Sequence, residues 1–192
     1  MKVLSLHQPY ATLIAVGQKT IETRSWRAPA SMIGQRFAVH AAQKRPADYW
    51  CRSNADPIYP SALFPLYDRG RCIDEQETAD GEWWRYRWAG PLGCVVATAR
   101  LADCVPMVVT PTYPHPCVIL GSAFDQSPTM YFPYPRGVSA EDDGSRIIDD
   151  DVPFGDFRPG RFAWLLDEVQ PLDTPIPFKG GQGLSRSWSP DA

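Results

Sequence analysis

The sequence lacks several features that would assign a compartment or a cofactor directly. No apolar run in its 192 residues is long enough to span a bilayer, and the first residues lack the long apolar core of a secretory signal. The five cysteines are spread along the chain without a Cys-x-x-Cys pair, and no ligand set surrounds the three histidines. We therefore expect a cytoplasmic protein with reduced, mostly buried thiols, no membrane contact, no metal site and no cofactor.

Charge of one sign does not dominate the sequence either. The net charge is −3, which argues against a protein that coats nucleic acid nonspecifically with a basic surface. Residues 1–52, however, hold eight Lys or Arg and two acidic residues, so this part carries about +6 and the remainder about −9. A local basic surface attracts polyanions even on an acidic protein. We therefore expect the ligand-binding site in the first quarter of the chain.

Proline and glycine, in contrast, are abundant. The 20 prolines and 14 glycines leave little room for long helices, and the chain length suits one domain. We predict an α+β, mainly β fold, a small β-barrel with short flanking helices, formed as a single domain over residues 1–192. Two irregular stretches, about 53–88 and 106–150, are predicted to be long loop insertions.

Alternation and turn signals predict the regular elements. Lys2–Leu6 alternates as a short strand, and Pro9 opens a helix that Gly17 ends. We expect structural roles for His40, in the middle of a predicted strand, and for Trp164. The remaining predicted elements are a short helix at 47–52 and strands at 19–24, 36–41, 92–105, 161–166 and 175–178.

The segment after the predicted helix concentrates charged side chains beside an aromatic ring. Lys19, Glu22 and Arg24 lie close together in the sequence, and Trp26 follows them. An arginine fork suits phosphate, and a carboxylate can hold that fork or accept a hydrogen bond from a base amine. A cluster of surface ion pairs is the alternative. Strict alternation places Glu22 and Arg24 on one face and Lys19 on the other, so Lys19 must reach over from the turn or the strand must bulge.

Other segments offer further candidates. His7 is either a hydrogen-bonded structural residue or a catalytic one, and Gln8 either caps the helix or contacts a ligand. Residues 83–88 interleave arginines with aromatic rings, as single-strand binders do, although an ordinary hairpin explains the pattern equally well. The glycine-rich stretch 179–186 is a tight turn or a phosphate-contacting loop, but not a P-loop. The acidic stretch 141–151 lacks EF-hand spacing and is predicted to be a solvated loop.

Several blocks of the sequence together resemble a known family. They are residues 5–11 (Ser-Leu-His-Gln-Pro-Tyr-Ala), the Gly-x-Lys-x-x-Glu-x-Arg-Ser-Trp pattern at 17–26, and later pieces at 92–96, 101–104, 160–164 and 177–180. This set is similar to the ASCH (ASC-1 homology) domain family. The resemblance implies a PUA-like β-barrel, in a superfamily that mostly handles RNA, DNA or modified nucleotides.

Some ASCH relatives are enzymes, which keeps catalysis open. One is an amidohydrolase that removes an acyl group from acetylated cytidine, and another is reported as a ribonuclease. In the amidohydrolase, a lysine matching Lys19 activates a threonine three residues later, and here Glu22 stands at that position. This departure argues against the same acyl-transfer mechanism. An enzymatic role would instead use Lys19 with Glu22 as base or acid.

The sequence thus predicts a module that binds RNA, single-stranded DNA or a nucleotide. The predicted ligand-binding residues are His7, Gln8, Lys19, Glu22, Arg24, Trp26 and Lys179. The enzymatic alternative is a hydrolase of a modified nucleoside or of RNA, in which Lys19 and Glu22 are catalytic. A third alternative is a protein-interaction module that uses the Pro- and Tyr-rich stretch 111–116.

Overall fold

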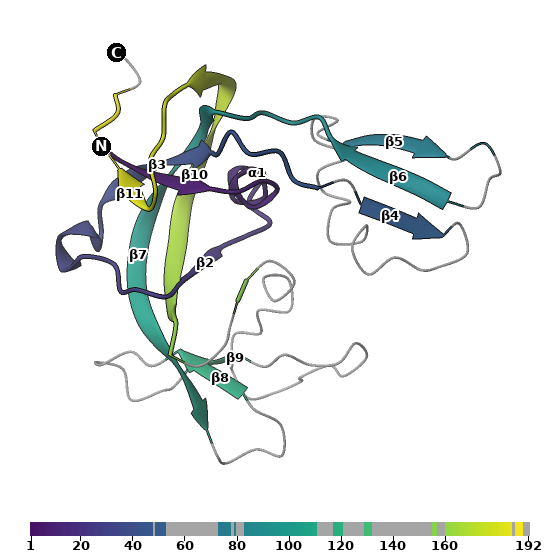
Figure 1. Cartoon of the computed structure of the whole chain (residues 1–192). Coiled ribbons are helices and arrows are strands. Elements are labelled where there is room, and N and C mark those ends of the chain that lie inside the picture. Colours follow the sequence, from purple (N-terminus) through teal and green to yellow (C-terminus); the bar gives the residue numbers. More distant parts are fainter. Residues whose placement is uncertain are drawn as a thin grey trace. The chain divides into compact units, whose positions relative to one another are not determined.

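The computed structural model of the chain consists mainly of β-strands (Figure 1). It describes residues 1–47, 49–52, 73–77, 79, 83–110, 117–120, 129–131, 155–156, 160–185 and 187–189. The chain divides into two compact units. The first comprises Met1–Gln18, Arg36–Ala99 and Val169–Ala192, and the second comprises Lys19–Gln35 and Arg100–Glu168.

The first strand of the chain pairs with one strand on each side. Strand β1 (Lys2–Leu6) runs antiparallel to β11 (Leu184–Ser185) and parallel to β3 (Arg36–Ala41). Val3 and Leu4 point to opposite faces of the strand and both are fully buried, as expected for a strand covered on both sides. The bounds predicted for β1 and β3 are confirmed. A core cluster of the first unit contains Val3, Ala38, Val95 and Trp188, with Leu172, Ile176 and Phe178 packed against it.

The single α-helix among the described residues is short and almost entirely buried. Helix α1 (Tyr10–Ala15) follows Pro9, whose fixed φ suits a helix start. The side chain of Gln8 caps it, because Gln8 Oε1 accepts a hydrogen bond from the backbone N–H of Thr12 at 3.1 Å. Gly17 adopts a φ of +78°, which a residue without Cβ tolerates, and the helix ends there. The predicted start and end of this helix are confirmed.

A separate three-stranded sheet also belongs to the first unit. It contains β4 (Tyr49–Arg52), β5 (Ile73–Glu77) and β6 (Trp83–Trp88) in the order β4-β6-β5, all antiparallel (Figure 1). The prediction of a short helix at 47–52 is therefore wrong. Its aromatic residues favour a strand once a partner is present, and pairing with β6 overrides the weak local helix signal.

The second unit is built on the pairing of β2 with β10. Strand β2 (Ile21–Arg24) runs antiparallel to the start of β10 (Phe162–Pro177), with Glu22 opposite Trp164. A core cluster of this unit contains Ile21, Val105, Met107 and Ala163, with Leu165 packed against it. Trp164 is fully buried, which confirms its expected structural role. A 3-10 turn, η1 (Ala30–Met32), lies between β2 and β3 in the sequence.

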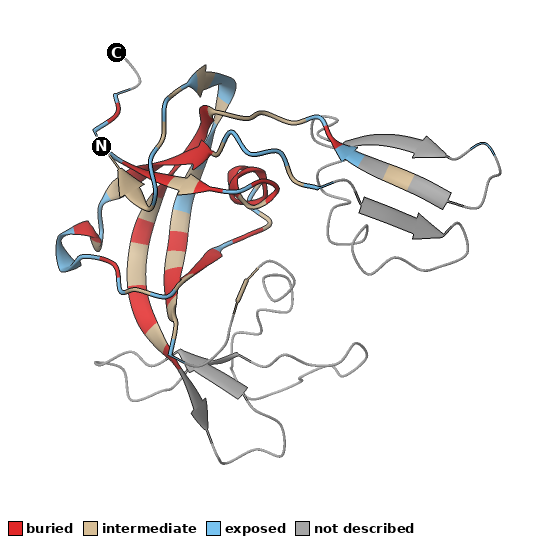
Figure 2. Ribbon diagram, in the orientation of Figure 1, coloured by how far each residue is buried: buried red, intermediate tan, exposed pale blue. Residues whose placement is uncertain are grey.

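Two long strands contribute residues to both units. They are β7 (Cys94–Thr110) and β10, and buried and partly exposed residues succeed one another along each (Figure 2). Two strands, at 161–166 and 175–178, had been predicted where β10 forms one continuous strand through Pro171 and Pro175. Proline φ is compatible with extended backbone, however, so the strand continues through both.

The stretch expected to be irregular from residue 106 onward also contains strands. Besides the end of β7 it holds β8 (Cys117–Leu120), which pairs with β7, and β9 (Thr129–Tyr131), which pairs with β8. The prediction of a long loop there is thus corrected in part. The mainly β, small-barrel type of fold predicted from the sequence is confirmed by the described elements.

His40 is a buried structural residue in β3. Its Nε2 lies 3.0 Å from the backbone oxygen of Phe178, and its Nδ1 lies 3.0 Å from Ser5 Oγ. Because a carbonyl only accepts, Nε2 carries the proton and Nδ1 accepts from the serine hydroxyl. Desolvation lowers the pKa of His40 and outweighs the opposite effect of the Phe178 carbonyl. The predicted structural role is confirmed.

Two cysteines have side chains that the structure describes. Cys94 and Cys104 are free and buried, and burial raises the pKa of both thiols. Cys72, His115 and the stretches 111–116 and 141–151 lie outside the described residues. No helix among the described residues has the length and apolarity to cross a membrane, and no group of three or more His, Cys, Asp or Glu there could hold a metal ion.

Candidate functional site

The candidate site is built on β2 and the turn that precedes it. Backbone N–H of Leu166 donates to the oxygen of Thr20, and Glu22 is opposite Trp164. In an antiparallel pair, every second residue turns its N–H and C=O toward the partner strand. Thr20, Glu22 and Arg24 therefore face β10 with their backbone groups, whereas the carbonyls of Ile21 and Thr23 point to the outer edge of β2.

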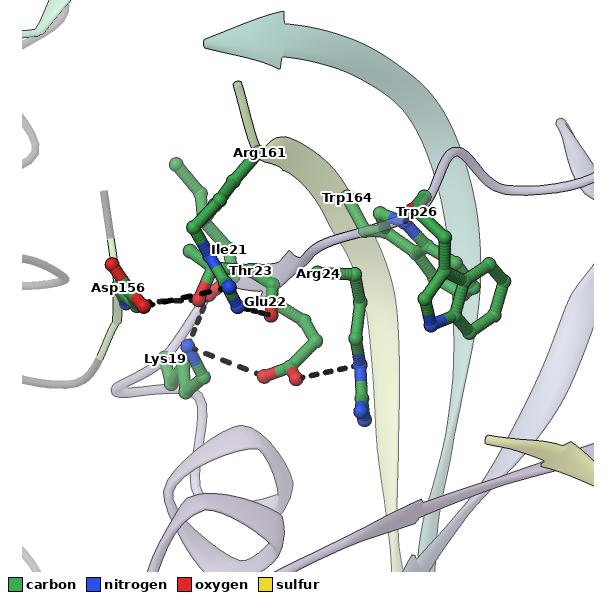
Figure 3. A network of polar contacts seen from close by, with 9 residues as sticks. All are labelled: Lys19, Ile21, Glu22, Thr23, Arg24, Trp26, Asp156, Arg161 and Trp164. Carbon is green, nitrogen blue, oxygen red and sulfur yellow. Dashed lines mark hydrogen bonds and ion pairs between the residues drawn. The ribbon is translucent and has the colours of Figure 1, made fainter. Parts of the chain in front are cut away.

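Lys19 is completely buried, although lysine is rarely found so. Its ammonium donates a hydrogen bond to the carbonyl of Ile21 and lies 3.5 Å from Glu22 Oε2 (Figure 3). Strand β2 begins only at Ile21, so strand alternation does not fix the direction of Lys19. The side chain reaches over from the turn, which was one of the two solutions that the sequence allowed.

Glu22 joins two cations with one carboxylate. Its Oε1 lies 3.0 Å from Arg24 Nε, and its Oε2 faces Lys19 Nζ (Figure 3). Glu22 and Arg24 are two residues apart on one strand and share a face, as alternation predicted. Only 8 % of Glu22 is exposed, so water screens these ion pairs little. We call Lys19, Glu22 and Arg24 the β2 charge cluster.

Aromatic residues flank the β2 charge cluster. The ring of Trp26 meets that of Trp164 edge to face, with centroids 4.8 Å apart and planes at 89°. Trp164 Nε1 also donates to the backbone oxygen of Trp26 at 3.4 Å. Trp26 remains partly exposed, and the side chain of Arg24 is 21 % exposed. The part of the cluster that solvent reaches therefore consists mainly of an arginine with a fixed indole nearby in the sequence.

Arg161 and Asp156 are site residues that sequence reasoning missed. Arg161 Nη2 donates to the carbonyl of Thr23 at 3.4 Å, and its Nη1 lies 3.4 Å from Asp156 Oδ2. The backbone N–H of Asp156 donates to Thr23 Oγ1 at 2.9 Å (Figure 3). Both outward carbonyls of β2 thus accept from a cationic side chain, Lys19 at one and Arg161 at the other. Arg161 lies in the block 160–164 that resembles the family, but no sequence pattern indicated Asp156.

The other predicted ligand-binding residues belong to the first unit. His7 is exposed, and its backbone oxygen accepts from Ala11 N–H at 3.4 Å. Gln8 is buried, and its Nε2 donates to Thr12 Oγ1 at 2.8 Å and to the backbone oxygen of Pro91 at 2.9 Å. Lys179 is exposed. The structure thus joins Lys19 to Glu22 and Arg24, and shows Gln8 in the helix-capping role that the sequence left open.

The comparisons with known proteins give one result at the level of the family. No curated protein matches the sequence. The sequence model of the ASCH domain matches residues 4–112, which is more than half of the chain. The matched range includes the helix-capping Gln8, the β2 charge cluster and Trp26. The chain therefore belongs to the ASCH domain family.

Proposed function

We propose that this ASCH protein binds RNA, single-stranded DNA or a nucleotide, and that Arg24 makes the central contact with a phosphate or a base edge. Membership of the ASCH family supports an RNA-binding, PUA-like module in general terms. The observation that supports Arg24 in particular is its ion pair with the buried Glu22. A guanidinium held by a fixed carboxylate loses less conformational freedom on binding than a mobile surface arginine.

The three residues of the β2 charge cluster have different parts in this proposal. Lys19 is fully buried and therefore positions Glu22 rather than touching the ligand. Glu22 orients Arg24, whose planar fork matches phosphate oxygens. Trp26 offers a partly exposed ring, and stacking of one base on such a ring contributes about 1–3 kcal/mol.

Two exposed residues of the first unit are proposed separately from the β2 charge cluster. His7 and Lys179 are both exposed and are further proposed contacts with the ligand. Gln8 is buried at the start of α1, so its contribution is to hold the helix rather than to touch the ligand.

The test measures binding of labelled RNA and single-stranded DNA by fluorescence anisotropy. Arg24→Ala is expected to weaken binding by about 10-fold or more, because a charge-assisted contact is lost. Arg24→Lys keeps the charge but not the fork, and is expected to lose most of the same affinity. Affinity should also fall steeply with added salt.

Arg27→Ala is the matched control for this experiment. Arg27 is exposed three residues further along, and its guanidinium lies 5.7 Å from the centre of the Phe162 ring rather than beside a buried carboxylate. We expect at most about a 3-fold loss for this variant. Equal losses for Arg24→Ala and Arg27→Ala would mean that a diffuse basic surface binds the ligand. No binding of any oligonucleotide or nucleotide at low salt would refute the proposal.

A second candidate function is hydrolysis of a modified nucleoside or of RNA. The observation in its favour is the fully buried Lys19 ammonium, 3.5 Å from the Glu22 carboxylate, since buried ionisable pairs are typical of catalytic sites. In this case Lys19 and Glu22 touch the substrate after it enters. Turnover of acylated cytidine or of labelled RNA that is lost in Lys19→Met would support this candidate. Activity that survives in Lys19→Met would contradict it.

A further inference from the structure

The three-stranded sheet of the first unit separates its residues into two different faces. Successive residues of a strand point to opposite faces. In β6, positions Trp83, Arg85 and Arg87 therefore share one face, and Trp84 and Trp88 lie on the other. The arginines of this strand thus share one face with Trp83, and the positions on the other face are all aromatic.

The described side chains at the end of β6 show which face is open to solvent. Trp88 is only 5 % exposed, whereas its neighbour Arg87 is exposed. Arg85, on the same face as Arg87, is partly exposed. The face that carries the arginines is therefore the one that a ligand in solution can reach.

Strand β4 places residues of the same two kinds at positions on the face that holds Arg85 and Arg87. Trp50 is opposite Arg85, and Arg52 is opposite Trp83. Residues directly opposite each other in an antiparallel pair share a face. Cations and tryptophans thus alternate across the two strands as well as along β6. We call these positions, Trp50, Arg52, Trp83, Arg85 and Arg87, the arginine–tryptophan face.

Strand β5 leaves the charge of the open face positive. Asp74 is opposite Arg87 and Gln76 is opposite Arg85, so β5 contributes one acidic residue against three arginines. Neighbouring strands are about 4.8 Å apart, and same-face residues along a strand are about 6.5–7 Å apart. Rings and cations at such intervals suit a chain whose bases and phosphates alternate.

We infer that the arginine–tryptophan face is a second nucleic-acid site, which binds a single strand. Its arginines contact phosphates, and its tryptophans stack on unpaired bases. A duplex hides its base faces, so it can use the arginines but not the rings. An acidic peptide would likewise need only the cations. The inference shares the ligand class of the proposed function but does not depend on Arg24.

The test uses the full chain and a labelled single-stranded RNA or DNA of about 12 nucleotides. This length lies within the site sizes known for one β-sheet domain that binds single strands. Arg85→Ala/Arg87→Ala is expected to weaken binding by about 10-fold or more. It should also reduce the slope of log affinity against log salt by about 1.4, because two phosphate contacts are lost. Trp83→Ala is expected to cost about 5-fold or more through lost stacking.

Lys44→Ala/Arg45→Ala is the matched control, since it removes two positive charges from exposed positions of the same unit. At most about a 3-fold loss is expected for it. Arg87→Ala alone changes an exposed side chain and is therefore expected to fold. It replaces the double variant in the test if the double variant does not fold. A loss of about 3-fold or more for Arg87→Ala supports the inference.

Three results would overturn the inference. They are an equal loss in the control, equal competition by a duplex of the same length, and binding of an acidic peptide without binding of the single strand. Arg24→Ala separates this inference from the proposed function. If only Arg24→Ala weakens binding, the arginine–tryptophan face is not a site, whereas the proposed function stands. If only the β6 variants weaken binding, the arginine–tryptophan face is a site and the proposed contact of Arg24 is refuted.

Discussion

Replacing Glu22 by Gln tests the central physical argument, that one carboxylate compensates a fully buried ammonium. The variant keeps the shape of the side chain and removes its charge. Lys19 then retains the carbonyl of Ile21 but loses the carboxylate at 3.5 Å. Two unit charges at that distance interact by about 4–5 kcal/mol at an effective dielectric constant of 20. Removing one partner of a buried ion pair costs about 3–5 kcal/mol in measured cases, so we expect this loss in the free energy of unfolding.

The assay is thermal and urea unfolding followed by circular dichroism. For a chain of 192 residues, the expected loss corresponds to a fall in Tm of about 6–20 °C. Lys19→Met/Glu22→Gln should be more stable than Glu22→Gln alone by about 1 kcal/mol or more, because the buried ammonium that faced the Glu22 carboxylate is also gone. Glu168→Gln is the matched control, since Glu168 pairs with Arg100 at 2.9 Å but its side chain is 55 % exposed. That change should cost less than about 1 kcal/mol.

Two outcomes would refute the reasoning. If Glu22→Gln costs no more than Glu168→Gln, the carboxylate does not compensate a buried charge. If the costs of Lys19→Met and Glu22→Gln simply add in the double variant, the two groups are not coupled. Either result would remove the basis for assigning Lys19 a positioning role.

Two further predictions concern the His40 contact of the first unit. The pKa of His40 is lowered in the folded state, so below its ordinary value of 6.5 the unfolded chain binds more protons than the folded chain. The Tm should therefore fall as the pH drops from about 7 to 5. The variant His40→Gln should lose this pH dependence. Gly180→Ala should destabilise the protein by about 1–3 kcal/mol in urea unfolding, because the added Cβ would lie 2.3 Å from His40 Cε1 and 2.6 Å from Ser5 Oγ. Gly181→Ala should cost less, because its added Cβ would come no nearer than 3.2 Å, to Ser185 Cβ. A flat pH profile for the unmodified chain, or equal costs for the two glycine variants, would contradict them.

The elements with strong local signals could be predicted from the sequence. Alternation identified β1 and β3, and Pro9 and Gly17 marked the two ends of α1. These signals are intrinsic to the backbone, because a proline sets its own φ and a glycine relieves a left-handed turn wherever the chain folds. Partners elsewhere in the chain had little influence on them.

The elements that depend on pairing could not be predicted in the same way. Residues 49–52 form a strand because β6 lies beside them, and nothing within those four residues requires it. The continuity of β10 between 166 and 175 was not predicted either, because a segment with Pro171 and Pro175 is assigned to a strand only when its pairing is known. Strand pairing between distant segments decides such cases, and single-sequence patterns carry little information about it.

The composition of the β2 charge cluster was predictable, but the burial of Lys19 was not. Spacing identified Lys19, Glu22 and Arg24 as one set, and alternation placed Glu22 with Arg24. The hydrogen bond from Lys19 to the carbonyl of Ile21 depends on where β2 begins, and strand ends are the least certain part of a sequence prediction. This one uncertain boundary changes the role of the lysine. A lysine on the strand face would be a cation for phosphate itself. A buried lysine in the turn instead faces the carboxylate of Glu22, and Arg24 is then the cation of the cluster that we propose for the ligand contact.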